Sequence, residues 1–527
     1  MPAYSSTLLS ALSTPGLFPS AAARGFRWLA AATQTAGPRT PLHRGGLGGT
    51  AALCLVLLAV AGIAPRVGAA ADNPRKDMII ASVDAQAEAL ANLSDEIWRN
   101  AEIAFRETKS SDALVAHAQR HGFRVTRGTG DIPTAFVAEY GSGRPIIGIM
   151  GEFDALPGLS QAAVPERSPI ETGAPGHGCG HNVFGAASLG AAIAVRELIE
   201  AGELSGTVRY YGTPAEEKFF GKLWMIRAGA FEDVDVMMDW HPGDKIEASV
   251  QSTQALVDFL VEFDGQAAHA AADPWNGRSA GDALELYTSG INAYREHIRP
   301  TVRIHYHIMD AGKVVNVVPD YAKIWVRVRD RDRAGMTPVY ERVQAMAEGA
   351  AIMADVDHKV TLISGVHEIL PNRSGGAALQ ANLETLGGIR YTAEEEAFAK
   401  AIQKATGKPE VGMDAEVLPL RETQRNPDGG STDVGDVSYN VPTISLAAPI
   451  AGKDVPWHSW AVVASGGMSI GHKGLVYAAK ALAMTMVDLF EDPQLVADIK
   501  AEFRERKGDY EYEGILPPGP PPLDFPQ

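Results

Sequence analysis

Residues 145–158 read PIIGIMGEFDALPG, and this stretch contains the pattern that decides the fold class. A short apolar run, typical of a buried strand, is followed by two acids and a Pro-Gly turn. Residues 183–200 have the length and small-residue content of a helix packed closely against a sheet. Strand-and-loop patterns return at 206–217, 234–243 and 441–449, and helical patterns occupy 80–120, 222–230 and 470–491. Strands that alternate with helices predict an α/β fold with a mostly parallel sheet.

The pattern of apolar and polar residues changes from about residue 250. Apolar and polar residues alternate at 255–263, 301–309 and 322–330, helical patterns fill 280–298 and 336–354, and a further strand falls near 358–364. The resulting order β-α-β-β-α-β is that of a small ferredoxin-like unit with two helices on one face of an open sheet. Because such a unit can fold alone, we expect a domain inserted into the α/β domain.

These patterns give a division of the chain into five segments. We expect a signal or targeting segment over 1–71, the α/β domain in two parts over 72–248 and 367–508, the inserted domain over 249–366, and a disordered Pro-rich tail over 509–527. The tail is assigned from its composition, LPPGPPPLDFPQ.

Composition and charge restrict the class of protein. The chain has 527 residues, of which 46% are hydrophobic and 21% charged, so it has room for two or more globular domains. Its net charge is −17, which makes it a poor partner for nucleic acid. We therefore expect no nucleic-acid partner.

The first 71 residues contain no acidic residue and carry an unbroken apolar run of 14 residues at 51–64. This run is short for a transmembrane helix but suits the core of a signal peptide, since basic residues precede it and small residues follow it. The pattern favours export to the periplasm or the exterior after cleavage, with no stable membrane span. The alternatives are a transit peptide, an uncleaved anchor at 51–64, or a cytoplasmic protein whose start lies further downstream.

Cysteine usage points to metal binding. The chain has two cysteines, and Cys54 lies in the apolar run that a signal peptidase would remove. The mature protein then keeps only Cys179, which cannot form an internal disulfide. A free thiol outside the cell is open to oxidation and to pairing with other molecules. Coordination to a metal ion would protect this thiol.

Cys179 lies in the motif GHGCGHN at 176–182. His181 is two residues further on, so both side chains can reach one point, and a thiolate with an imidazole suits zinc or another borderline divalent metal. The alternative is a Gly-rich turn with solvated histidines. His177, in the same motif, is not expected to be a ligand.

Further polar side chains follow the other expected strands. These side chains are Asp154, Glu216, Glu217, His241 and His458. Loops at the carboxyl ends of parallel strands converge on one crevice, so we expect these groups to meet Cys179 and His181 there. The set has more ligands than one zinc ion needs, which favours two metal ions a few ångströms apart with a bridging thiolate or carboxylate. In the adjacent Glu216–Glu217 pair, one carboxylate would bind metal and the other would stay free as a general base.

Six motifs, in order over residues 78–510, resemble those of the M20 metallopeptidase family, in its amidohydrolase branch. They are GHGCGHN, GTPAEE, DWHPG, GQAAHAA, NVVPD and WHSW. The resemblance implies that the α/β domain is a di-metal catalytic domain with zinc or manganese. It also implies that the insert is a lid or dimerisation domain, through which the chain forms a homodimer or heterodimer.

The resemblance also implies roles for individual residues. Cys179 would bridge the metals, His181, Glu217, His241 and His458 would be further ligands, Glu216 would be the catalytic base, and Asp154 would orient a ligand. His269 would reach a neighbouring subunit's site and stabilise the oxyanion, and Asn316 would help it or hold substrate. The alternatives without a catalytic role are that Asp154 caps a helix and that His269 is an ordinary surface histidine. Residues 429–438 would line the site through Thr432, Asp433 or Asp436, or form a plain Gly-rich turn.

The function implied by the resemblance is hydrolysis of the amide bond of an N-acyl or N-aroyl amino acid, such as p-aminobenzoyl-glutamate, by metal-activated water. The alternatives are a dipeptidase or aminoacylase with the same site, and a non-catalytic binding protein stabilised by metal. One departure from the family is that Lys218, Phe219 and Phe220 stand where relatives are usually rich in Gly and Ser. Substrate preference is therefore left open.

Overall fold

A computed structural model describes residues 73–423 and 429–525 of the chain. All of these residues belong to one compact unit, Gly68–Gln527. The expected targeting segment, residues 1–71, lies outside the described residues.

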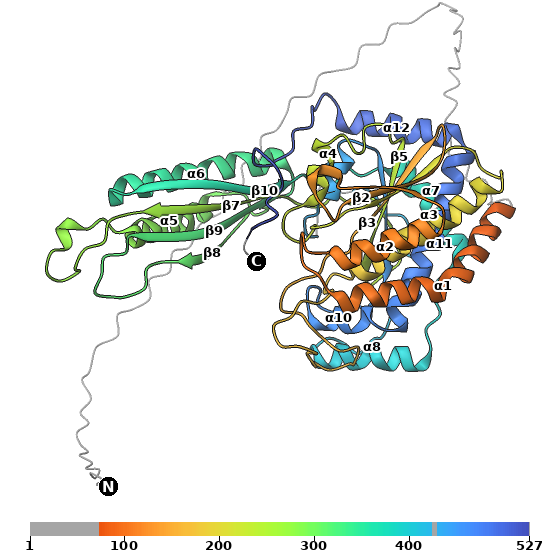
Figure 1. Ribbon diagram of the computed structural model, residues 1–527, viewed down its shortest axis with the longest axis horizontal. Helices are drawn as coiled ribbons and strands as arrows, with labels where there is room; N and C mark the ends of the chain where they lie inside the picture. The colour runs from red at the N-terminus through yellow and green to blue at the C-terminus, as the bar shows by residue number, and fades with distance from the viewer. Residues whose placement is uncertain (1–72, 424–428, 526–527) are drawn as a thin grey trace, which may run out of the picture. The chain divides into compact units, whose positions relative to one another are not determined.

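The larger sheet has seven strands in the order β1-β2-β4-β3-β5-β11-β6 (Figure 1). The bounds are β1 Arg124–Arg127, β2 Phe136–Gly141, β3 Ile146–Gly151, β4 Thr207–Gly212, β5 Val236–Gly243, β6 Glu247–Ser249 and β11 Thr443–Pro449. The central strands β4, β3, β5 and β11 are parallel to one another. Both edges are antiparallel, because β2 pairs with β4, β1 with β2, and β6 with β11.

The sheet is therefore mixed, and the prediction of a mostly parallel sheet was wrong at its edges. The four central strands are clear apolar runs in the sequence and were predicted. Strands β1, β2 and β6 were not predicted, because they are short or rich in polar residues. The short connection between β1 and β2 favours antiparallel pairing, since parallel neighbours need a long crossover.

Helices pack on this sheet and on one another. Their bounds are α1 Pro74–Asn100, α2 Thr108–Arg120, α3 His181–Glu200, α4 Gly221–Arg227, α7 Arg373–Leu386, α8 Ala393–Ala405, α9 Val434–Ser438, α10 Trp460–Gly466, α11 Ser469–Glu491 and α12 Pro493–Lys507. Helix α1 begins where the Asn73 side chain accepts a hydrogen bond from the Arg75 N–H group, and it turns Ile79, Val83 and Leu90 into the core at helical spacing.

Helix α3 is the central helix of the core. Sixteen of its residues are buried, and small residues allow its close approach to the sheet. A Cβ atom at Gly185 would lie 2.7 Å from the carbonyl oxygen of Glu152, so only glycine fits there. Among the described residues, α3 alone is long and apolar enough to cross a membrane, but 83% of its apolar window is buried inside the protein. Its apolar character thus corresponds to its place in the core.

The smaller sheet is entirely antiparallel, with strand order β10-β7-β9-β8. Its strands and helices follow one another as β7 Ala255–Asp264, α5 Ala280–Tyr294, β8 Arg303–Asp310, β9 Tyr321–Asp330, α6 Arg333–Ala354 and β10 Asp357–Val366. The two helices contact each other and cover one face of the sheet, where alternating residues of the strands form a separate apolar core. The chain enters and leaves this sheet at neighbouring positions, because Leu256 is paired with Val366.

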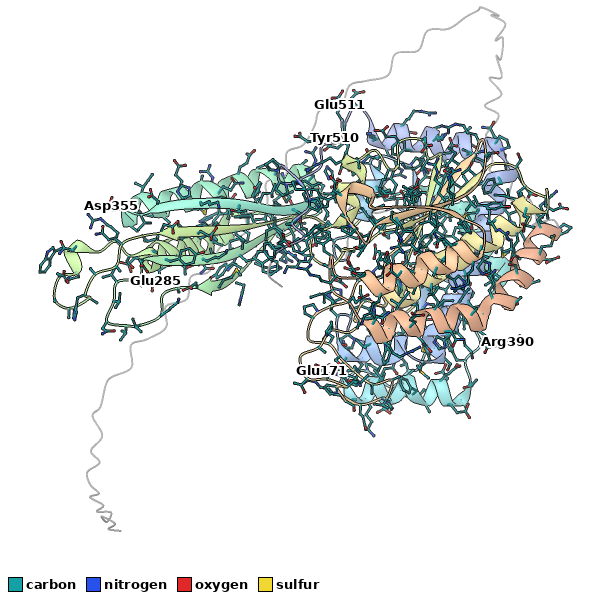
Figure 2. All side chains as sticks on the ribbon, viewed as in Figure 1. Glu171, Glu285, Asp355, Arg390, Tyr510 and Glu511 are labelled. Carbon is teal, nitrogen blue, oxygen red and sulfur yellow. The ribbon has the colours of Figure 1, made fainter. Side chains whose placement is uncertain are left out.

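The segment that follows α12 differs from the expected disordered tail over 509–527. Residues 509–525 run from α12 to the smaller sheet, where the Gly365 N–H group donates to the carbonyl oxygen of Ile515 (Figure 1; Tyr510 and Glu511 are labelled in Figure 2). The Tyr512 hydroxyl donates to Asp436, and the Phe525 ring packs edge-on against Phe219. The prediction of disorder rested on the high proline content of this segment. Large apolar and aromatic side chains lie between the prolines, and these side chains pack against the rest of the protein.

Candidate metal centre

The GHGCGHN loop turns sharply at Gly180, which has a φ of 82°. A side chain there would be strained, and its Cβ atom would lie 2.4 Å from Ile450, so glycine is required between the two expected ligands. Helix α3 begins at His181, and Cys179 is buried at the end of the loop. The turn brings Cys179 and His181 to the carboxyl end of the parallel strands.

His241, on strand β5, faces Cys179. Its Nε2 atom lies 3.4 Å from the Cys179 Sγ atom. Its Nδ1 atom lies 2.8 Å from the carbonyl oxygen of Pro242, which can only accept, so Nδ1 carries the proton and Nε2 keeps its lone pair. Burial lowers the pKa of His241 to about 4, so the ring is neutral at physiological pH. A neutral imidazole with a free Nε2 atom is a competent metal ligand.

Asp154 joins two of the expected ligands. One carboxylate oxygen accepts a hydrogen bond of 2.8 Å from His181 Nδ1, and the other accepts one of 2.9 Å from the Glu217 N–H group. Burial opposes ionisation of Asp154, but the neighbouring His181 outweighs it and lowers the pKa of Asp154. The carboxylate fixes the ring orientation of His181 and the backbone position of Glu217 at the same time.

The loop that carries Glu216 and Glu217 is held by a buried acid. Its first residue, Ala215, has a φ of 62°, and its N–H group donates to Glu107 over 2.9 Å. Burial raises the pKa of Glu217 to about 8. Burial, together with the negative charges of Glu152 and Glu217, raises the pKa of Glu216 well above its ordinary value. Such a concentration of buried acids is typical of functional sites.

His458 reaches the same place from the far end of the sequence. Its N–H group donates to the carbonyl oxygen of Gly178 over 3.0 Å, which joins the WHSW loop to the GHGCGHN loop. Its Nε2 atom lies 3.7 Å from a carboxylate oxygen of Glu217. His177, in contrast, is buried with Nε2 bonded to the carbonyl oxygen of Ile97, and it is absent from every metal-binding group of the described residues.

Three groups of potential ligand atoms lie close enough to hold a metal ion, within 4.8 Å of one another in each group. They are Cys179–His181–His241, Cys179–Glu217–His458 and Glu152–His181–Glu216. Three atoms of these groups are buried and have no hydrogen-bond partner among the described residues, namely Glu152 Oε2, His181 Nε2 and Glu217 Oε1. Divalent cations would satisfy such atoms, and the mixture of thiolate, imidazole and carboxylate suits zinc or manganese.

Sequence analysis missed two residues of this cluster. Glu152 stands in the same acidic stretch as Asp154, and that stretch was its only signal. Lys222 carried no signal at all, yet its fully buried ammonium group donates to Glu152 and to Asp433 over 2.6 Å each. Asp433, for which the sequence allows either a site residue or a plain turn, lies beneath the cluster through this contact with Lys222.

His269 and Asn316 lie elsewhere, on exposed loops of the smaller sheet. The two residues adjoin, because the Ala270 N–H group donates to the carbonyl oxygen of Asn316 and His269 pairs with Val317. The His269 Nδ1 atom accepts from the N–H groups of Ala271 and Ala272, so the ring carries its proton on Nε2. Within the described residues, no hydrogen bond or ion pair joins either side chain to the metal-binding groups.

A mixed α/β fold with clustered thiolate, imidazole and carboxylate groups defines a metal-dependent hydrolase, and the sequence comparison identifies its family. The sequence model of peptidase family M20/M25/M40 matches residues 148–453, more than half of the chain. The chain therefore belongs to this family of peptidases and amidohydrolases.

Individual relatives agree with this assignment. The chain is 37% identical over 465 residues to a p-aminobenzoyl-glutamate hydrolase subunit of Escherichia coli (strain K12), across 83% of this chain and 96% of the relative. It is 29% identical over 446 residues to Xaa-Arg dipeptidase of Homo sapiens, across 80% and 90%. A solved structure with the same fold, a dinuclear metal binding peptidase of Bacillus subtilis, has a TM-score of 0.52 at 19% identity and covers 77% of this chain and 99% of that one.

Proposed function

We propose that this chain is a di-metal amidohydrolase that cleaves the amide bond of an N-acyl or N-aroyl amino acid. The observation that carries the proposal is that two groups of metal-binding side chains share Cys179, while the buried carboxylate of Glu216 lies beside them. The name of the Escherichia coli relative makes p-aminobenzoyl-glutamate the first substrate to test.

Cys179 would bridge two cations, one held also by His181 and His241 and the other by Glu217 and His458. Bound divalent cations would polarise the scissile carbonyl group and lower the pKa of the attacking water. The position of Glu216 supports its role as general base, because its buried carboxylate lies within ligand distance of the metal-binding side chains, where it can reach metal-bound water. Glu216 would take the proton of water and deliver it to the leaving amine.

The smaller sheet with its two helices would be a ferredoxin-like dimerisation or lid domain. His269 is exposed and unattached to the metal centre, and exposed apolar side chains lie on the same loops, with Trp275 73%, Val314 57% and Val315 99% exposed. Apolar surface of this kind marks an interaction site. We infer that the loops enter the site of a second subunit, where His269 would stabilise the oxyanion and Asn316 would contact substrate. The Escherichia coli relative is named as one subunit of its enzyme, which makes a heterodimer as well as a homodimer plausible.

A dipeptidase is the second candidate function, and the similarity to Xaa-Arg dipeptidase favours it. Both functions need the same chemistry at the amide bond, so they differ only in the side chains that recognise the substrate. Of the three residues that follow the proposed catalytic pair, Lys218 is partly exposed and is the first candidate for that role, whereas Phe219 and Phe220 are buried. Phe219 stacks on Phe105 at 4.9 Å, and the Lys218 ammonium group lies over the Phe219 ring.

The test is hydrolysis by protein loaded with zinc or manganese. The panel contains p-aminobenzoyl-glutamate, N-acetyl amino acids and Xaa-Arg dipeptides, and release of the free amine is measured. Glu216→Gln, the matched control, should retain both metal ions by elemental analysis and lose about 10²–10⁴-fold in turnover, the usual contribution of a general base. Cleavage confined to dipeptides would favour the second candidate. Failure to cleave any member with two ions bound would contradict both.

A further inference from the structure

Glu152 is a fully buried carboxylate that follows strand β3, and its two oxygens have different surroundings. Oε1 accepts a hydrogen bond of 2.6 Å from the Lys222 ammonium group. Oε2 is buried and has no hydrogen-bond partner among the described residues. A buried anionic oxygen without a partner is costly, so its surroundings must supply something positive.

The free oxygen of Glu152 is directed at the metal centre. Glu152 Oε2 lies 3.0 Å from His181 Nε2. The two atoms form no hydrogen bond with each other, and neither has another hydrogen-bond partner among the described residues. His181 Nδ1 is engaged with Asp154, so Nε2 is the atom available to a metal ion. Glu216 completes a group in which the three ligand atoms lie within 4.8 Å of one another. Two buried atoms that lack a hydrogen bond, and that face each other as an ion pair, thus adjoin the third ligand atom of this group.

We propose that Glu152 is a further metal-facing carboxylate, whose Oε2 atom binds the cation that His181 holds. The inference rests on the proposed two-cation site and adds a ligand that belongs neither to the GHGCGHN motif nor to the Glu216–Glu217 pair. Carboxylate oxygen is a suitable third or fourth ligand for zinc and a preferred one for manganese.

Lys222 anchors this carboxylate through Oε1, the oxygen that does not face His181, and Asp433 anchors Lys222 in turn. The Lys222 ammonium group lies between Glu152 and Asp433, and the Lys222 N–H group donates to the second oxygen of Asp433 over 3.0 Å. One buried positive charge therefore faces two buried carboxylates. The uncompensated negative charge is available to a cation, and the bond to Oε1 restricts rotation of the carboxyl group, so that Oε2 stays directed toward His181.

The test is cobalt(II) binding by metal-free protein, followed through visible absorption and by competition with a chelator. Glu152→Gln preserves the shape and the bond from Lys222 but removes the anionic oxygen. It should weaken one of the two cobalt sites by about 10–100-fold and change its absorption spectrum. Glu152→Asp keeps the negative charge but places it farther from His181, because the side chain is one methylene group shorter. This variant should bind cobalt more tightly than Glu152→Gln and less tightly than the unmodified protein. This second variant serves if Glu152→Gln does not fold.

The matched control is Asp239→Asn. Asp239 is a buried carboxylate on the neighbouring strand β5, it accepts a hydrogen bond from Ser445, and it belongs to none of the three metal-binding groups of the described residues. Its variant should bind two cobalt ions with an unchanged spectrum. Wild-type affinity and an unchanged spectrum in the Glu152 variants would overturn the proposal, as would binding of fewer than two ions by the unmodified protein. Because the experiment measures binding and not hydrolysis, a protein that binds two ions but cleaves no amide would contradict only the proposed function.

Discussion

Cys179 illustrates how one residue depends on its surroundings. Burial raises the pKa of its thiol, and the nearby negative charge of Glu217 raises it further. The thiol on its own would therefore be inert, whereas a bound divalent cation would bind it as a thiolate. Its state should report on metal occupancy.

We predict that a thiol-alkylating reagent labels Cys179 slowly in metal-loaded protein and faster after chelation, because the ions hold the sulfur lone pairs and the glycine-flanked loop closed. Cys179→Ser should lose metal, since a hydroxyl is a poor anionic ligand at neutral pH. Cys179→Asp should retain more, since a carboxylate can also bridge. Mass spectrometry and elemental analysis check both points. Equal labelling in the two states, with full metal content in Cys179→Ser, would mean that the cysteine is only a loop residue.

Glu107 is a second residue whose hydrogen bonds affect the candidate site, although it belongs to none of the metal-binding groups of the described residues. It lies at the start of α2, is fully buried, and accepts from the Ala215 N–H group and the Thr134 hydroxyl. Burial, together with the charge of Asp154, raises its pKa to about 8. Its hydrogen bond with the Ala215 N–H group positions this strained residue, which precedes the proposed general base, Glu216.

We expect Glu107→Ala to lower kcat about tenfold or more with little change in KM, because the buried Ala215 N–H group loses its acceptor and Glu216 shifts. Glu107→Gln should restore activity, since its amide oxygen still accepts from Ala215. The control is Glu102→Ala, because Glu102 accepts from the N–H groups of Lys109 and Ser110 at the same helix but does not touch the loop. Equal losses of kcat in Glu102→Ala and Glu107→Ala would leave only a structural role for Glu107.

At the scale of helices and strands, the sequence predicted those elements whose apolar residues recur with a strong helical or strand period. The central parallel strands, helix α3 and the alternating strands of the smaller sheet are all visible as apolar runs or alternation. The strands β1, β2 and β6 were missed because short edge strands carry little apolar signal. The buried ammonium group of Lys222 was missed for a different reason, since only the folded chain brings Glu152 and Asp433 to it. Spacing along the chain located the loops of the site, but not the side chains that support them.

The segment after α12 makes a prediction at this scale. Tyr512 donates to Asp436 on helix α9, which also accepts from His367 just after strand β10, so the segment is bonded to α9 as well as to the smaller sheet. Tyr512→Phe should lower the free energy of unfolding by about 0.5–1.5 kcal/mol. The lower part of this range is expected because Asp436 keeps its bond from His367. Denaturant melts check the value, with the exposed Glu511→Gln as control. A stability equal to that of the control would mean that the segment contributes nothing through this bond.

At the scale of the whole molecule, the role proposed for His269 would involve a second subunit. The metal-binding groups and His269 are on separate parts of one chain, and no hydrogen bond or ion pair of the described residues joins them, so we propose that the complete site takes them from two chains. A two-fold dimer would then build two equivalent sites, each with its metals from one subunit and its oxyanion donor from the other.

We predict that mixed dimers of Glu216→Gln and His269→Ala regain activity, although each variant alone is inactive. One of the two sites in a mixed dimer combines an intact Glu216 with an intact His269. Random reassociation of equal amounts should therefore restore about a quarter of the normal activity. Separately tagged subunits allow mixed dimers to be purified before the assay. The absence of recovery in purified mixed dimers would argue that His269 does not act in the partner's site.

The pairing of Leu256 with Val366 has a consequence beyond the site itself. The two points at which the chain enters and leaves the smaller sheet are cross-strand neighbours. A segment whose ends adjoin can be lengthened, exchanged for another module or lost without displacing the scaffold that receives it. We therefore expect that replacement of this one contiguous segment would change the proposed partner and leave the candidate metal-binding side chains of the larger sheet in place.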